Sequence, residues 1–316
     1  MSPACSASEL LEAVRRKSPL ALGRAITLVE EGGARAGPIL AALDAGALPE
    51  AATLGLTGTG GAGKSTLAGR LIDRWRAGGR RVGLIAVDPS SPVSGGAILG
   101  DRVRMMRHAC DRDVVIRSMA SRGRLGGLSA ATAASARLMK LAGCDPVLVE
   151  TVGVGQAELD IVRLADLTAL VLAPGLGDDI QAMKAGLIEV ADLLVINKGD
   201  LPGAEALRRD LESIARERGR PLLKVSAREG EGVEALVSAI DSRFDEFKNN
   251  GELERRRSRS NDAEALDWAL EMAREVLDAA LQKQPPELKA REPRARAAAV
   301  VGELFGQKEA PTGQKK

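Results

Sequence analysis

The sequence predicts an α/β fold with a mostly parallel central sheet covered by helices, and with helical extensions at both ends. Short apolar runs alternate with stretches that are long enough for a helix, and parallel strands buried on both faces have this near-continuous apolar pattern. Apolar residues recur at helical spacing before and after this region. The 316 residues allow one large domain or two modest ones.

Residues 1–50 are expected to form an N-terminal helical extension. Leu10, Leu11 and Val14 begin a pattern of apolar residues at helical spacing, and Pro19 and Pro38 interrupt it. We therefore expect short helices with breaks between them.

Residues 51–247 are expected to form the α/β domain. Seven short apolar runs in this region are predicted strands: Thr53–Thr57, Val82–Val87, Val114–Arg117, Val147–Glu150, Leu167–Ala173, Leu193–Asn197 and Leu222–Val225. Most of them are separated by enough residues for a covering helix, which favours parallel strand pairing.

Residues 248–305 are expected to form a C-terminal helical arm. The arm opens with the basic stretch NNGELERRRSRSN, which we interpret as a solvated helix end or linker rather than a nucleic-acid patch. One apolar stripe predicts a long helix from Asp262 to about Lys283, and the prolines at 285 and 286 end it. Residues 306–316 are expected to be disordered.

The composition excludes several classes of protein. Lys and Arg total 45 against 43 Asp and Glu, so the formal charge of +2 gives no electrostatic case for a nucleic-acid or membrane partner. One His and three scattered Cys argue against a zinc site or a disulfide scaffold. No apolar run approaches the roughly 20 residues that span a bilayer. We expect a cytoplasmic protein.

The strongest functional signal lies between the strand run TLGLT and a predicted helix. It matches the phosphate-binding pattern G-x-x-x-x-G-K-[ST], with the residues Gly58, Thr59, Gly60, Gly61, Ala62, Gly63, Lys64, Ser65 and Thr66. Glycines let backbone N–H groups point inward, and the helix start adds its dipole. Lys64 is expected to reach the β- and γ-phosphates and Ser65 to bind Mg²⁺. The pattern predicts a P-loop nucleoside triphosphatase.

A second motif indicates which base is bound. Asn197, Lys198 and Asp200 form N-K-x-D after the run LLVIN. The carboxylate accepts hydrogen bonds from the ring N–H and exocyclic amine of guanine, whereas adenine would leave this charge unpaired. The short loop of Ser226, Ala227 and Arg228 is expected to lie behind the guanine. The predicted ligands are therefore GTP and GDP.

Carboxylates at the ends of three predicted segments complete the candidate site. Asp88, Asp101 and Glu150 are expected to position Mg²⁺ and the attacking water, with Lys64 as the fourth catalytic group. Glu150 stands where a Walker B strand usually has Asp. Taken singly, a carboxylate at a strand end is more often a helix cap, and this alternative stays open for Asp178 and Asp179.

Longer segments extend these motifs into a family resemblance. GTGGAGKST, AVDPSSPVSGGAILGDRVRM, VETVGVGQAE and APGLGDDIQAMKAGLIEVADLLVINKGD resemble the MeaB/ArgK family over about residues 10–290. These are P-loop GTPases that act as chaperones of adenosylcobalamin-dependent methylmalonyl-CoA mutase and related acyl-CoA mutases. The family's RGHLGG appears here with Arg124 in place of the histidine, so no histidine function carries over.

The resemblance implies a partner and a mechanism of coupling. It implies that GTP and Mg²⁺ gate cofactor loading and protect or reactivate the mutase, and that the C-terminal helices join two copies in a homodimer. A cobalamin adenosyltransferase is a further candidate partner. The segments that would couple nucleotide state to the partner contain the residues Gly153, Gln156, Asp178, Asp179, Gln181 and Lys184.

Hydrolysis is expected to be slow without a partner. The chain has no obvious arginine finger and no Gln directly after residues 150–153, although phosphoryl transfer depends on such positioning groups. Two other functions remain open. One is a metallocentre-maturation GTPase, which the scarcity of His and Cys disfavours. The other is an ATPase or kinase linked to basic amino acid transport, which N-K-x-D disfavours.

Overall fold

The computed structural model describes residues 6–88, 108, 110–120, 130–151, 157–175, 186–289 and 292–305. It divides into two units, residues 1–263 and residues 264–316, which are described separately below. Over the described ranges, no helix is both long and apolar enough to cross a membrane.

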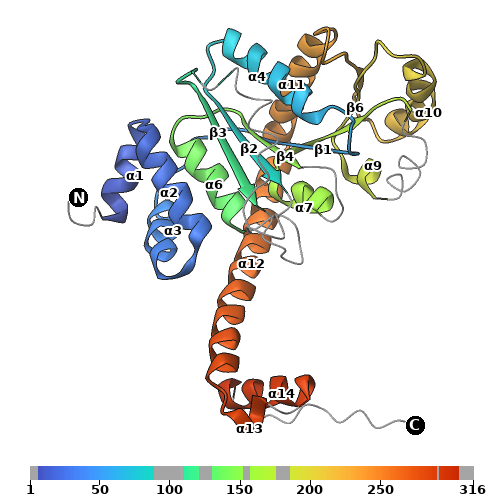
Figure 1. Cartoon of the computed structure of the whole chain (residues 1–316). Helices are drawn as coiled ribbons and strands as arrows, with labels where there is room; N and C mark the ends of the chain where they lie inside the picture. Colours follow the sequence, from blue (N-terminus) through green and yellow to red (C-terminus); the bar gives the residue numbers. More distant parts are fainter. Residues whose placement is uncertain are drawn as a thin grey trace, which may run out of the picture. The chain divides into compact units, whose positions relative to one another are not determined.

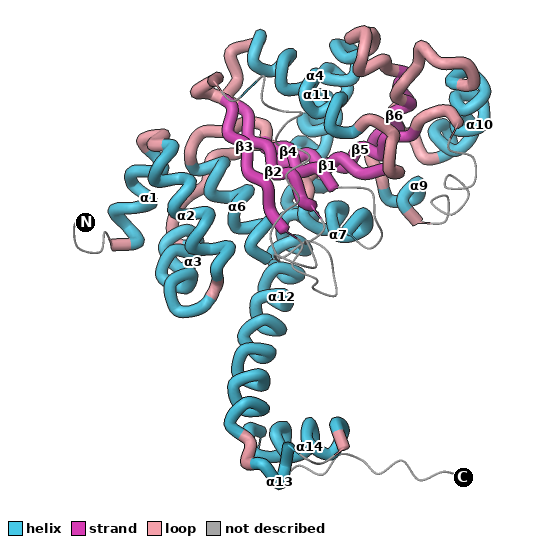
Figure 2. The backbone as a smooth tube through the Cα atoms, in the orientation of Figure 1, coloured by secondary structure: helices cyan, strands magenta, loops and turns pink. Residues whose placement is uncertain are grey.

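Unit 1 is built on a parallel sheet of seven strands within the described residues, in the order β3-β2-β4-β1-β5-β6-β7 (Figures 1 and 2). The strands are β1 (Thr53–Gly58), β2 (Val82–Asp88), β3 (Val114–Ala120), β4 (Val147–Thr151), β5 (Leu167–Leu172), β6 (Leu193–Ile196) and β7 (Leu222–Lys224). Each of the seven predicted apolar runs forms one strand, so the predicted parallel α/β fold is confirmed.

Helices cover both faces of this sheet (Figure 1). One face is covered by α4 (Lys64–Ala77) and α11 (Val233–Asn249), and the other by α6 (Ala130–Leu141), α7 (Ala157–Leu164), α9 (Leu187–Val190) and α10 (Ala204–Glu217). The result is a three-layered α/β/α arrangement with a core on each side of the sheet.

The central strand β1 shows how the two cores are divided. Leu54 and Leu56 are fully buried in the core beneath α4 and α11. The intervening Gly55 faces α7, where a Cβ atom would lie 2.7 Å from Ile161. Because alternate residues of a strand point to opposite faces, this glycine lets α7 pack closely against the centre of the sheet.

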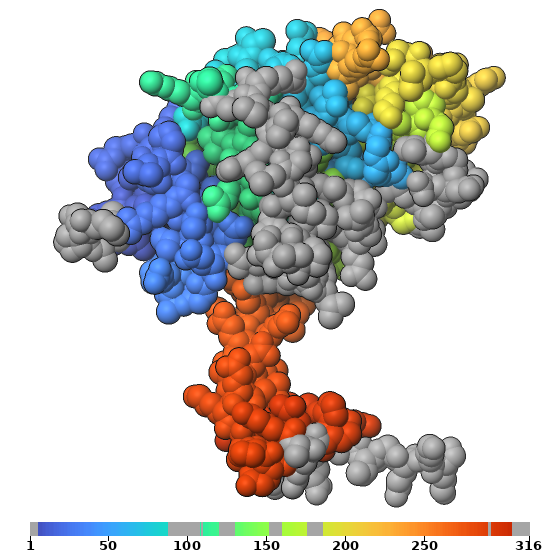
Figure 3. Space-filling model, in the orientation of Figure 1, coloured from blue at the N-terminus to red at the C-terminus, as the bar shows by residue number. Residues whose placement is uncertain are grey.

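The N-terminal residues form three helices that pack against α6. These are α1 (Ala7–Arg15), α2 (Pro19–Glu31) and α3 (Ala36–Asp44). Ser18 caps α2 and Pro19 is its first residue, a combination that favours a helix start. Their buried side chains form one small core, and in the space-filling view these blue helices lie against the green residues of the α/β region (Figure 3).

The helix α12 (Glu252–Lys283) begins earlier than the predicted Asp262. The basic run is therefore the start of a helix, which is one of its two predicted forms, and not a linker. The base of α12 is anchored by Leu253, which is buried in the same core cluster as Phe247, under α4 and α11. The guanidinium of Arg256 lies 4.3 Å from the ring centroid of Phe247.

Two arginines of the basic run pair with carboxylates at the starting ends of strands. Arg256 donates to both oxygens of Asp192 at 2.8 Å, and Arg257 donates to both oxygens of Asp166 at 2.9 and 3.1 Å. Lys140 of α6 also reaches Asp166, at 3.2 Å. These ion pairs fix the base of α12 to the sheet edge opposite the carboxyl ends of the strands.

Each of these aspartates also caps a neighbouring strand. Asp166 accepts the backbone N–H of Thr53 at 2.8 Å, and Asp192 accepts that of Thr168 at 2.9 Å. Burial of Asp166 opposes its ionisation, but the hydrogen bond from Arg257 and the charge of Lys140 outweigh burial and hold the pKa of Asp166 below its usual value. Asp166 is therefore ionised at neutral pH.

Unit 2 consists of the second part of α12 with α13 (Pro286–Lys289) and α14 (Pro293–Phe305). Gln284 and Arg296 join these helices by two hydrogen bonds of 3.2 Å, and Val300 is buried. Several large apolar side chains of this unit are exposed, namely Leu266, Leu270, Met272, Val276, Val301 and Leu304.

Candidate nucleotide-binding site

The phosphate-binding motif lies at the centre of the sheet's carboxyl edge. It connects the end of β1 to the first residue of α4, and β1 lies between β4 and β5. From β1 the sheet extends through β4 and β2 to β3 on one side, and through β5 and β6 to β7 on the other. Open α/β sheets bind ligands at such a point, where the strand order reverses.

Two glycines of the loop have conformations and surroundings that other residues would disturb. Gly63 has φ +87°, and a Cβ atom there would lie 2.5 Å from the Asn197 amide nitrogen. Gly58 has φ +143°, and a Cβ atom there would lie 2.0 Å from the Val171 carbonyl oxygen. The backbone can therefore curl above the start of α4, and the N-terminus of a helix is a position that favours an anion.

The lysine of the motif is folded into this loop. Lys64 is 6% exposed, and its ammonium donates to the carbonyls of Gly58 at 2.5 Å and Thr59 at 3.0 Å. The hydroxyls of Thr57, Thr59 and Thr151 are buried nearby and have no hydrogen-bond partner among the described residues. Because buried polar groups are normally paired, these hydroxyls suit a site that is completed by a polar ligand.

Ser65 and Glu150 meet beside the loop. Leu56 of β1 is paired with Glu150 of β4, which places this carboxylate next to the phosphate-binding motif. The Ser65 hydroxyl donates to the Glu150 carboxylate at 2.5 Å, and Glu150 is 1% exposed. A hydroxyl and a carboxylate are oxygen ligands of the kind that Mg²⁺ prefers, and the ion takes its remaining ligands from water and phosphates. The residues present therefore fit a magnesium ion.

Asp88 is the last residue of β2, the strand beside β4. Its backbone lies at the same sheet edge as Glu150, but its side chain lies outside the described part of the structure.

The guanine motif follows β6 and is tied to the phosphate-binding loop. The Asn197 amide donates to the carbonyls of Ala62 at 2.8 Å and Gly63 at 3.3 Å. Its oxygen accepts the N–H of Ala227 at 3.0 Å. Asn197 thus links the two halves of the candidate site. Lys198 has φ +56°, a left-handed backbone conformation that residues other than glycine rarely adopt.

Asp200 lies beside the loop after β7. The Ser226 hydroxyl donates to its carboxylate at 2.6 Å. This hydrogen bond lowers the pKa of Asp200 below its usual value, with smaller contributions from Arg228 and Lys198. Asp200 is therefore an ionised acceptor at neutral pH, as recognition of the guanine N–H groups requires. Arg228 itself is exposed and pairs with Glu229 at 3.6 Å.

Arg70 of α4 is a site residue that the motifs did not predict. Its guanidinium donates to the carbonyls of Ala227 at 2.8 Å and Arg228 at 2.6 Å. No local sequence signal marks it, because it pairs with backbone atoms more than 150 residues away.

The remaining predicted site residues are not placed by the structure. Outside the described residues lie Asp101, Gly153, Gln156, Asp178, Asp179, Gln181 and Lys184, together with the segment that contains Arg124. Of the predicted catalytic set, the described part brings Lys64 and Glu150 together around the motif.

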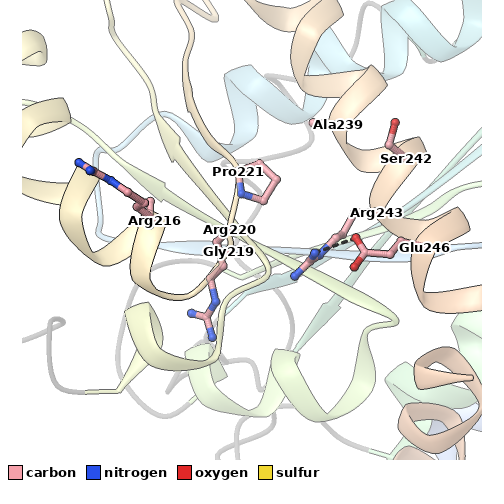
Figure 4. A pocket seen from close by; sticks show the side chains of 9 residues that line it. Arg216, Gly219, Arg220, Pro221, Ala239, Ser242, Arg243 and Glu246 are labelled. Atoms are coloured by element: carbon pink, nitrogen blue, oxygen red, sulfur yellow. Dashed lines mark hydrogen bonds and ion pairs between the residues drawn. The ribbon is translucent and has the colours of Figure 1, made fainter. Parts of the chain in front are cut away.

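A separate pocket of about 550 Å³ lies between the loop before β7, α10 and α11 (Figure 4). It opens at the starting end of β7, away from the carboxyl edge that carries the nucleotide motifs. Arg243 pairs with Glu246 at 2.8 Å, and Arg220 donates to backbone carbonyls of Ile188 and Glu189. Arg216 points away from the other two in Figure 4. These arginines therefore do not converge on a common point.

The chain matches the family model "Methylmalonyl Co-A mutase-associated GTPase MeaB" over residues 22–285. A relative from Pyrococcus abyssi, which is named "Putative GTPase", is 46% identical over 261 residues, which cover 79% of this chain and 80% of the relative. The GTPase ArgK of Escherichia coli is 44% identical over 199 residues, covering 61% of this chain and 59% of ArgK.

One solved structure resembles nearly the whole chain. It is described as an LAO/AO transport system kinase, and it has a TM-score of 0.68 and 27% identity, with coverage of 95% of this chain and 97% of the other. It has the P-loop fold that the sequence predicts. Since the family model spans most of the chain and the relatives are named GTPases, this chain belongs to the MeaB family of methylmalonyl-CoA mutase-associated GTPases.

Proposed function

We propose that this GTPase is a nucleotide-gated chaperone of an adenosylcobalamin-dependent acyl-CoA mutase of the methylmalonyl-CoA type. In this function it controls cofactor loading and protects or reactivates the mutase. The observation that carries the proposal is the family match over residues 22–285, whose description names association with that mutase. A relative from Mus musculus, 37% identical over 217 residues, is named methylmalonic aciduria type A homolog, mitochondrial.

The described residues support the nucleotide chemistry that such gating needs. The loop 58–66 would hold the phosphates, with Lys64 turning from the loop carbonyls toward their negative charge. Asp200 would accept the guanine N–H groups, and Asn197 would keep the base motif in register with the loop. Bound Mg²⁺ would neutralise charge that develops on the phosphates.

Ser65 and Glu150 would hold that ion, and Asp88 and Asp101 would complete the group that orients the metal and the attacking water. The Ser65–Glu150 hydrogen bond supports this assignment because it brings two hard oxygen ligands together beside the phosphate loop.

Hydrolysis is expected to be slow until the mutase binds. Arg70 is the first arginine after the phosphate-binding loop. It donates to the carbonyls of Ala227 and Arg228 in the loop 226–228, called the guanine loop below, and is not available as an arginine finger. A positioned arginine contributes a factor of about 10³–10⁵ to phosphoryl transfer. We propose that the partner reorders the segments around residues 153–156 and 178–184 and so supplies the missing stabilisation.

The second unit would join two copies of the chain. Leu266 and Leu270 form one exposed pair at i, i+4 spacing on α12, and Met272 and Val276 form another, each side chain at least 52% exposed. Exposed apolar patches of this kind mark interaction surfaces. Sedimentation of the wild-type chain should give a dimer, and Leu266→Glu with Leu270→Glu should give a monomer. A monomeric wild-type protein would contradict this part of the proposal.

The chaperone function is tested by pulling down candidate mutases with the immobilised chain. The comparison is between GDP and a non-hydrolysable GTP analogue, each with Mg²⁺. We expect mutase binding to differ between the two states and GTP turnover to rise when the mutase is added. The matched control is Lys64→Ala, which should bind the mutase equally in both. Equal capture by the wild-type chain, with unchanged turnover, would contradict the chaperone proposal.

A further inference from the structure

Two side chains hold the guanine loop against the phosphate-binding half of the site. Asn197 accepts the Ala227 N–H at 3.0 Å and donates to the loop carbonyl of Ala62 at 2.8 Å. Arg70 approaches from α4 and donates to the carbonyl of Ala227 at 2.8 Å. The backbone N–H and C=O of Ala227 are therefore both engaged, which holds the peptide planes on either side of this residue.

The position of one carbonyl fixes the direction of the next N–H group. A trans peptide is planar, so the C=O of Ala227 and the N–H of Arg228 point in opposite directions. Arg70 draws this C=O, and also the C=O of Arg228, toward α4. The Arg228 N–H must then point away from α4. Within the described part of the chain, no residue accepts a hydrogen bond from this N–H.

We propose that Arg70 is a positioning residue for base selection, which holds the Arg228 N–H as a donor to the oxygen at position 6 of guanine. Guanine presents an acceptor at this position, whereas adenine presents an amine. Arg70 thereby adds a second selection to that of Asp200, which accepts from the ring N–H and the 2-amino group. This inference rests on the guanine-nucleotide binding proposed above.

Arg70 has the strength and the location for such a function. It makes two charge-assisted hydrogen bonds, of 2.8 and 2.6 Å. It also belongs to the helix whose first turn carries Lys64 and Ser65. Its position on that helix connects the guanine loop to the helix that would bind the phosphates.

The test compares three diphosphates by calorimetry in the full chain with Mg²⁺. The reference is GDP, 6-thio-GDP replaces the oxygen at position 6 by a weaker acceptor, and IDP lacks the 2-amino group. Wild-type protein should bind both analogues more weakly than GDP. In Arg70→Ala the GDP affinity should fall about tenfold. The loss caused by sulfur should largely disappear, whereas the loss caused by removing the amine should remain.

Arg74→Ala is the matched control because Arg74 lies one turn further along the same helix and pairs at the surface with Glu234. It should leave all three affinities unchanged. Arg70→Lys, which keeps the charge but offers fewer donors, should restore part of the sulfur discrimination.

The outcomes separate this proposal from others. If Arg70→Ala weakens all three ligands by the same factor, Arg70 only stabilises the loop and the proposal is overturned. Unchanged affinities in a folded Arg70→Ala protein would overturn it as well. Calorimetry of the wild-type protein with ADP tests the proposed guanine selectivity separately. If the affinity for ADP equals that for GDP, the proposed guanine-nucleotide binding is wrong, and this inference is wrong with it.

Discussion

Arg256→Ala tests whether the ion pairs at the base of α12 stabilise the fold. The Arg256 side chain is 22% exposed and its partner Asp192 only 6%. Removal of the arginine leaves this carboxylate with the Thr168 N–H as its other hydrogen-bond donor in the described structure. An uncompensated buried charge costs about 3–5 kcal/mol, and loss of the contact with Phe247 adds to it. We expect the free energy of unfolding to fall by about 4 kcal/mol.

The basic run itself provides the matched control. Arg259 lies one turn away, is 70% exposed and pairs with Glu252 at the surface. Arg259→Ala should therefore lower the free energy of unfolding by less than about 0.5 kcal/mol. Urea titrations followed by the fluorescence of the buried Trp75 measure both variants.

A double-mutant cycle separates the ion pair from simple loss of packing. Asp192→Ala in the Arg256→Ala background removes the charge that Arg256→Ala leaves uncompensated, so the two losses should be far from additive. We expect a coupling free energy of at least about 1.5 kcal/mol. Additive losses, or an Arg256→Ala effect no larger than that of Arg259→Ala, would refute a stabilising buried pair.

Three further predictions concern single side chains. Asp200→Asn should shift nucleotide preference from guanosine to xanthosine diphosphate because the amide donates where the carboxylate accepted; unchanged GDP affinity in calorimetry would contradict base reading. The lowered pKa of Asp166 stabilises the fold above about pH 4, and this stabilisation is lost as the pH falls through the lowered pKa. Asp166→Asn should therefore reduce the acid-side decrease in the free energy of unfolding, measured by urea titration at a series of pH values. An unchanged decrease would contradict this prediction. Burial raises the pKa of Cys144 to about 11, so iodoacetamide should label the exposed Cys110 and spare Cys144; peptide mass spectrometry would reveal equal labelling if this is wrong.

The sequence predicts the fold well because the inner strands β1, β2, β4, β5 and β6 are buried on both faces. Each strand reads as a short apolar run, and the phosphate-binding motif marks the transition from β1 to α4. The contacts of Lys64 and Glu150 follow from the motif and from the parallel pairing of β1 with β4. Local pattern and global topology agree at these positions.

Contacts between distant segments could not be predicted in the same way. The charge pattern of residues 254–260 suits a solvated surface, and only the folded chain places Arg256 and Arg257 against aspartates at the starts of β5 and β6. Arg70 likewise forms its contacts with backbone carbonyls, which leave no trace in residue types. Long-range pairing of this kind depends on topology rather than on periodicity.

The central claim is that a guanine nucleotide binds between the loop 58–66 and Asp200, and titration calorimetry with Mg²⁺ tests it most directly. We predict binding of GDP to the wild-type chain, much weaker binding of ADP, and loss of GDP binding in Gly63→Val, because a side chain there would meet Asn197. Absence of heat with GDP, equal affinity for ADP, or full GDP binding by a folded Gly63→Val protein would contradict the account.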